Sequence, residues 1–242
     1  GTKWDEIPEV LRADPMDSYT PLSSLSVWFN ASDANAVYKD SSNKISKWFD
    51  WSGNLRMAIQ DDSNLQGEYV PSSSELNNLP TVKFDANTKI MQVTGEKFKS
   101  KHVFTIFRSI NTNFSNYGSV LGSTSGSRTF IFEKNNTVFH SNLYPTAVSK
   151  DGMPLISNYY LRIIDEYMLL EVKPNSPDSL RNYYINHQDS YGAKLEIAEI
   201  LSFDEELSAA KTIEINYYLS TKWGLTDKID SDGDGVVDAR DL

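Results

Sequence analysis

The stretch Leu195-Glu-Ile-Ala-Glu-Ile-Leu-Ser-Phe203, with the segment that follows it, decides the fold of this chain. Its apolar run has the length of a strand and ends at Asp204. The next segment predicts a helix over Ala209–Lys222, because Ser208 can cap its first turn and Gly224 can terminate it. A late strand followed by one helix, packed on the edge of a sheet structure, is therefore expected.

Similar runs of strand length occur from Leu25 onward, divided by clusters of Gly, Asn, Asp, Ser and Pro. Around ten strands are too many for one open sheet, so the pattern predicts an all-β fold with two stacked antiparallel sheets. The predicted strands are Leu25–Phe29, Thr81–Phe84, His102–Ile110, Ser119–Leu121, Thr129–Glu133, Thr137–His140, Tyr159–Ile164, Tyr167–Val172, Arg181–Asn186 and Leu195–Phe203.

The chain divides into three parts. Residues 1–24, which mix charge with proline and serine, are expected to form a lead-in strap. Residues 25–226 form the β domain, whose size lies within the range of a single all-β domain. Residues 227–242 are expected to hold a calcium-binding loop.

Composition excludes several classes of partner. A net charge of −10, without clustered Lys and Arg, argues against nucleic acid and anionic membranes. The apolar runs are far shorter than the roughly 20 residues needed to cross a bilayer, so no membrane insertion is expected. The chain has no cysteine, which excludes disulfides and Cys-ligated zinc. An acidic chain of this kind suits an extracellular location with abundant calcium.

The segment Asp230-Ser-Asp-Gly-Asp-Gly-Val-Val-Asp-Ala-Arg-Asp241 matches a twelve-residue calcium loop. Its acids fall at positions 1, 3, 5, 9 and 12, and a glycine supplies the sharp turn at position 6. Ca²⁺ prefers roughly six to eight oxygen ligands, which short carboxylates on a tightly turning backbone can provide. The predicted ligands are Asp230, Asp232, Asp234, the Val236 carbonyl, Asp238 (directly or through water) and Asp241.

A resemblance to a known family rests on several segments taken together. They are Val27–Asp33, Lys47–Asn54, Leu76–Asp85, Val103–Arg108, and the closing runs Glu196–Asp204 and Tyr218–Gly224. In this order they resemble the concanavalin A-like, laminin G-like (LamG) jelly-roll domains of bacterial secreted and surface proteins. The resemblance implies a two-sheet antiparallel jelly-roll sandwich that binds glycans or proteins through a concave face or rim loops, often with calcium. The C-terminal loop resembles those of dockerins and thrombospondin type 3 repeats.

Glucanases related to this family place catalytic acids at alternate positions of one strand. The corresponding strand here begins with Glu196, whose face is continued by the apolar Ala198 and Ile200, and Glu199 is expected on the opposite face. Both glutamates are therefore predicted to be structural, with no catalytic residues and no enzymatic activity.

Ligand contacts are expected at a rim or concave surface lined by the loops around 111–118 and 140–160, because the segment 112–192 departs from the family pattern. Sugar rings stack on aromatic side chains, and amides can pair with hydroxyl groups in both roles. The predicted ligand residues are Tyr117, Tyr144, Tyr159, Asn113, Asn116, Asn142 and Asn158. The alternative for each tyrosine is packing beneath its own loop. Trp28, Phe84, Phe104 and Trp223 are assigned to packing instead.

The sequence thus favours a non-catalytic, calcium-dependent, carbohydrate-binding module of a secreted or cell-surface bacterial adhesin. The alternative is a structural or protein-binding spacer in a calcium-stiffened surface protein. A second calcium ion among Asp33, Asp40, Asp50 and Asp85 is weighed against simple turn capping by these residues.

Overall fold

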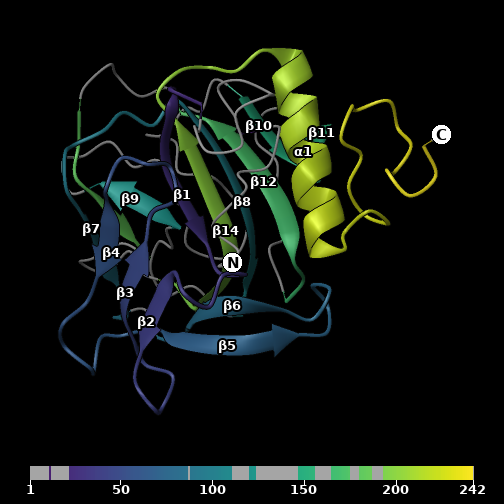
Figure 1. Ribbon diagram of the computed structural model, residues 1–242. Coiled ribbons are helices and arrows are strands. Elements are labelled where there is room, and N and C mark those ends of the chain that lie inside the picture. Colours follow the sequence, from purple (N-terminus) through teal and green to yellow (C-terminus); the bar gives the residue numbers. More distant parts are fainter. Residues whose placement is uncertain are drawn as a thin grey trace.

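The computed structural model describes residues 11, 22–86, 88–110, 120–123, 147–155, 165–174, 180–186 and 193–241. Within these ranges the chain forms two antiparallel sheets and one helix (Figure 1). The predicted strands Thr129–Glu133, Thr137–His140 and Tyr159–Ile164 lie outside the described residues, as does nearly all of the predicted strap. No helix among the described residues is long and apolar enough to cross a membrane.

The larger sheet has eight strands, centred on β14 (Leu195–Phe203). β14 pairs with β8 (His102–Ser109) on one side, and with β6 (Leu79–Phe84) and β1 (Leu25–Asn30) on the other. Outward from β8 and β6 the sheet continues with β12 (Met168–Lys173), β10 (Ala147–Lys150), β11 (Met153–Pro154) and, at the opposite edge, β5 (Glu68–Ser73).

The smaller sheet has six short strands. Their order is β2 (Val37–Lys39), β3 (Ile45–Phe49), β4 (Met57–Ile59), β7 (Met91–Thr94), β13 (Tyr183–Ile185) and β9 (Leu121–Ser123). The two sheets share a buried apolar cluster to which Trp48 and Tyr183 of the small sheet and Phe84 and Phe107 of the large sheet contribute. The expected two-sheet sandwich is therefore present.

Helix α1 (Ala209–Trp223) covers the outer face of the large sheet, not its edge as the sequence suggested. A second apolar cluster joins Leu219 and Trp223 of the helix to Trp28, Phe104 and Leu201 of the sheet. The two caps are those predicted from the sequence: the Ser208 hydroxyl accepts a hydrogen bond from the Lys211 amide, and Gly224 is left-handed with φ 69°. The molecule thus has three layers, in the order small sheet, large sheet and helix (Figure 1).

An irregularity in β14 changes the expected direction of one glutamate. The register of β14 against β8 shifts between Ile197 and Glu199, so Ala198 is an extra residue in the strand. As a result Glu196 and Glu199 both point to the helix side, where Glu196 contacts Tyr167 and Glu199 contacts Trp223. The prediction that Glu199 lies on the opposite face is wrong, because strict alternation fails at a bulge.

Candidate metal centre at the C-terminal loop

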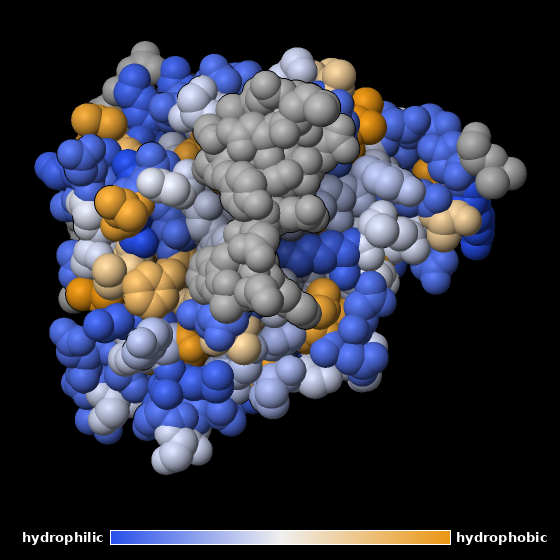
Figure 2. Space-filling view, viewed as in Figure 1, coloured by the Kyte–Doolittle hydropathy of each residue, from blue (hydrophilic) through white to orange (hydrophobic). Residues whose placement is uncertain are grey.

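The residues at positions 1, 3 and 5 of the predicted calcium loop lie together. One carboxylate oxygen from each of Asp230, Asp232 and Asp234 falls within 4.8 Å of the others. Asp230 is buried and the other two are exposed, so the group lies at the surface with one side against the protein. Figure 2 shows the C-terminal region as a mainly hydrophilic lobe at the right of the molecule.

Backbone turns bring these carboxylates together. Gly233 (φ 76°) and Gly235 (φ 97°) take left-handed conformations that side chains disfavour. Their amides donate to the two oxygens of Asp230, at 2.8 Å each. The amides of Asp234 and Val236 donate in the same way to Asp232 and Asp234. One lone pair on each of these oxygens is used by the backbone, which leaves others available for a cation.

Asp238 and Asp241 are not part of this group of three carboxylates. Both oxygens of Asp238 accept hydrogen bonds from Ser231, one from its amide and one from its hydroxyl, each at 2.8 Å. Asp238 therefore connects the later part of the loop to Ser231 at its start. Asp241 is exposed, and its charge acts on Asp232. The Val236 side chain is 39% exposed, as expected if only its carbonyl has a role in the loop.

The pKa of Asp232 reflects the crowding of negative charge. A hydrogen bond from the Asp234 amide lowers this pKa, but partial desolvation, the charges of Asp234 and Asp241, and a contact with Asp230 together raise it above its ordinary value. A divalent cation among these oxygens would remove that repulsion. The donor set, made of carboxylates on a tight turn, fits a hard cation such as Ca²⁺.

The loop is anchored to the sandwich at a hairpin turn. Asp151 (φ 53°) and Gly152 (φ 86°) form the two-residue turn between β10 and β11. The Asp230 amide donates to the Asp151 carbonyl at 3.0 Å, and the Asp230 carbonyl lies so close that a Cβ on Gly152 would be 1.5 Å from its oxygen. Ile229, which precedes Asp230, is fully buried in the helix-side cluster. This anchor was not predicted, although the pair Asp151-Gly152 is a hairpin signal in the sequence.

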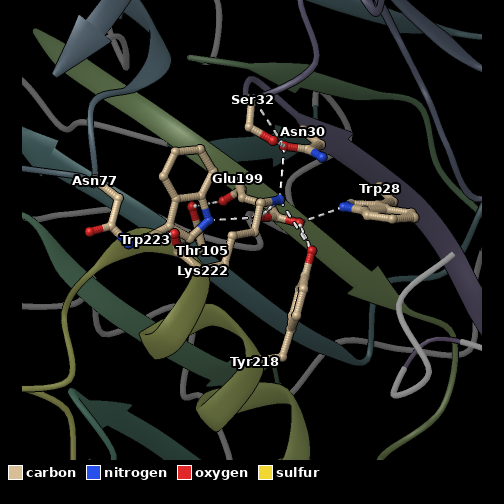
Figure 3. A network of polar contacts seen from close by, with 9 residues as sticks. All are labelled: Trp28, Asn30, Ser32, Asn77, Thr105, Glu199, Tyr218, Lys222 and Trp223. Carbon is tan, nitrogen blue, oxygen red and sulfur yellow. Dashed lines mark hydrogen bonds and ion pairs between the residues drawn. The ribbon is translucent and has the colours of Figure 1, made fainter. Parts of the chain in front are cut away.

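A second polar cluster lies under the helix around Glu199 (Figure 3). The Glu199 carboxylate is fully buried and accepts hydrogen bonds from two tryptophan indoles, those of Trp28 (2.6 Å) and Trp223 (2.7 Å). Lys222 lies 2.6 Å away as an ion pair, and the Tyr218 hydroxyl donates at 3.1 Å. Burial and the neighbouring Glu199 charge raise the pKa of Tyr218 well above its ordinary value. The cluster joins α1 to β1 and β14.

Glu196 has a similar set of donors. Thr81 and Tyr167 donate to one of its oxygens at 2.6 Å, and Arg108 donates to the other. Burial alone would raise the pKa of Glu196, but these hydrogen bonds outweigh burial and lower it. Both glutamates therefore link residues on the helix side of the large sheet.

The remaining predicted site residues are the four aspartates considered for a second calcium ion and the seven residues predicted to bind ligand. Asp33 and Asp40 accept turn amides and Asp50 accepts the amides of Trp28 and Ser52, as in turn capping. Asp85 forms an ion pair with Lys89. The seven predicted ligand residues all lie outside the described residues: Tyr117, Tyr144, Tyr159, Asn113, Asn116, Asn142 and Asn158.

Comparison with known proteins gives structural neighbours alone. No family and no curated protein matches the chain. A Trypanosoma rangeli sialidase in complex with the inhibitor DANA aligns with a TM-score of 0.48 and 12% identity, over 90% of this chain and 36% of the sialidase. The same sialidase in complex with sialic acid gives a TM-score of 0.44 and 11% identity, over 88% and 36%. The chain thus spans about a third of the length of these neighbours.

These neighbours correct one prediction from the sequence. The neighbours are sialidases, and the prediction that this chain has no enzymatic activity is withdrawn. With TM-scores below 0.5, the alignment assigns this chain neither the neighbours' reaction nor their ligand. The chain is therefore described by its own architecture, which in the described residues is a two-sheet antiparallel β sandwich with one helix and an acidic C-terminal loop.

Proposed function

We propose that this chain is an extracellular calcium-binding module with a jelly-roll sandwich, which binds carbohydrate as part of a bacterial surface adhesin. The observation that carries the calcium part is the convergence of Asp230, Asp232 and Asp234 within 4.8 Å, on a loop docked against the β10–β11 turn. This convergence supports the proposal, because three carboxylates that lie together can supply the oxygen ligands that Ca²⁺ prefers. The carbohydrate part rests on the resemblance to LamG-like domains.

Calorimetric titration with Ca²⁺ tests the metal site. One ion is expected to bind the unmodified protein, and Asp232→Ala and Asp234→Ala are each expected to abolish or strongly weaken this binding. Asp61→Ala, which removes an exposed acid from the loop between β4 and β5, is the matched control and should bind as the unmodified protein does. Unchanged stoichiometry and affinity in both loop variants would disprove the site.

A protein-binding or structural spacer is the second candidate, favoured by the way the loop is anchored. Ile229 is buried against the helix-side cluster, and Lys228 pairs with Glu166 at 3.1 Å, so calcium would stiffen a segment that is already docked. A glycan array probed with and without Ca²⁺ separates the two candidates. Binding to glycans supports the carbohydrate module, whereas calcium binding with no glycan bound leaves the spacer.

A further inference from the structure

A row of side chains crosses the outer face of the six-stranded sheet. Direct strand pairing joins, in order, Tyr38 of β2, Lys47 of β3, Ile59 of β4, Gln92 of β7 and Tyr184 of β13. Residues paired directly across strands share a face, so these side chains form one continuous line. We call this line the Tyr38–Tyr184 row.

The row points away from the core. The neighbouring row, made of Val37, Trp48, Ala58 and Val93, is paired in the same way and is buried between the sheets. Because successive residues of a strand alternate between faces, the Tyr38–Tyr184 row must lie outside. The other three sheet faces are occupied, since two meet in the core and α1 covers the third.

The exposure of the row agrees with this direction. Tyr38 is 60% exposed, Lys47 and Gln92 are exposed, and Ile59 and Tyr184 are half-buried. The side chains alternate in chemistry along the line, with an aromatic ring, an ammonium, an aliphatic group, an amide and a second aromatic ring. Strands lie about 4.8 Å apart, so four steps give a row of about 19 Å.

We propose that the Tyr38–Tyr184 row binds a neutral, unbranched oligosaccharide that lies across the strands of the small sheet. A pyranose ring has an apolar face that can stack on Tyr38, and hydroxyl groups that Gln92 can meet as donor and acceptor and Lys47 as donor. The proposal rests on the carbohydrate part of the proposed function and gives that function a site and a ligand class.

Two observations favour this ligand over others. Exposed Lys47 and Gln92 lie on either side of Ile59 in the row, whereas protein interfaces are depleted in lysine. A polyanionic glycan would meet a chain with a net charge of −10, which disfavours its approach. A neutral sugar is compatible with both observations.

Calorimetry with cellohexaose, laminarihexaose and xylohexaose, in the presence of Ca²⁺, tests the proposal. At least one of these probes is expected to bind, and Tyr38→Ala and Gln92→Ala are each expected to weaken it by roughly tenfold. Tyr38→Phe should retain most of the affinity, because the ring remains. The matched control is Tyr217→Ala, which removes a tyrosine of similar exposure (56%) from α1 on the opposite side of the molecule and should change nothing.

The other outcomes overturn the proposal in distinguishable ways. If a probe binds equally well to Tyr38→Ala and Gln92→Ala, with melting temperatures unchanged, the site lies elsewhere and the proposed function stands. Equal weakening by Tyr217→Ala would also remove the row as the site. If none of the three neutral probes binds but polygalacturonate does, the ligand is anionic. The inference then fails, and the carbohydrate part of the proposed function stands. If no glycan binds to a calcium-loaded protein, the inference and the carbohydrate part of the proposed function fail together.

Discussion

Glu199 and Lys222 form an ion pair that has little contact with water. The glutamate side chain is fully buried and that of the lysine is 17% exposed, so each charge depends on the other and on nearby donors. Removal of one partner from a buried pair leaves an uncompensated charge, which typically costs about 3–5 kcal/mol. The pair therefore specifies how α1 sits on the large sheet more than it adds net stability.

We expect Lys222→Met to lower the free energy of unfolding by about 3 kcal/mol, because it removes one partner of a buried ion pair. Adding Glu199→Gln to this variant should recover part of the loss. Lys211→Met is the control on the same helix, since it breaks the exposed Lys211–Glu214 pair and should cost less than about 1 kcal/mol. Urea denaturation measures all three, and equal losses in the two lysine variants would contradict the prediction.

Glu196 is expected to make stability depend on acid. Its pKa in the folded protein is below the ordinary value of 4.5, so the folded state binds this proton more weakly than the unfolded chain does. The stabilisation is complete above that value and is lost as the pH falls through the folded pKa.

Glu196→Gln should therefore be destabilising at pH 7, and its difference from the unmodified protein should shrink as the pH falls below 4.5. Urea midpoints at several pH values measure this. Glu75→Gln removes the exposed acid that also pairs with Arg108, and should have a small effect throughout. A difference between unmodified protein and Glu196→Gln that stays constant with pH would show that the carboxylate is not the titrating group.

At the scale of elements, the β10–β11 turn and the C-terminal loop are packed backbone to backbone. We expect Gly152→Ala to displace the loop, because its Cβ would fall 1.5 Å from the Asp230 carbonyl oxygen, and so to weaken calcium binding at least tenfold. Gly95→Ala is the control for backbone strain, with a similar positive φ (97°) but no contact with the loop. It should lower stability and leave calcium affinity unchanged. Equal calcium affinity in both variants would contradict the coupling.

The sequence predicted some elements far better than others. β14 and α1 were predicted nearly to the residue, because one is a long apolar run and the other has both caps in its sequence. β2, β3, β4 and β7 were missed, although they make up most of the small sheet. Each has three to five residues, with one face outside, so the apolar signal of any one strand is too short to separate it from a loop.

The sequence also predicted some of the site residues better than others, and the reasons are physical. The acidic C-terminal loop is a local sequence pattern, so the group of Asp230, Asp232 and Asp234 could be predicted from spacing alone. The direction of Glu199 depends on a bulge in β14, which is a property of strand pairing and leaves no clear mark in the sequence. The Tyr38–Tyr184 row combines residues of five strands, of which β7 and β13 are distant in sequence from the other three, and it can be recognised only when the strand register is known.

At the scale of the whole molecule, calcium should raise the melting temperature without being needed for the fold. The loop lies outside both apolar clusters, so the sandwich keeps its core without the ion. At a free calcium concentration 100 times Kd the stabilisation would be about 2.7 kcal/mol. For a domain of this size that corresponds to a shift of roughly 5–10 °C.

Differential scanning calorimetry in calcium and in chelator measures this shift, which Asp232→Ala and Asp234→Ala should abolish. Complete unfolding of the unmodified protein in chelator would contradict the prediction, because it would require an ion within the core.

The position of β14 has a consequence for how the chain reaches this structure during synthesis. β1 and β6 both pair with a strand that ends at residue 203, so residues near the start must wait until most of the chain has left the ribosome. Pairings this distant in sequence make folding slow. Until β14 arrives, β1, β6 and β8 have edges that can pair with other chains. A nascent chain arrested before residue 195 should therefore require a chaperone, and one arrested with α1 fully emerged should not.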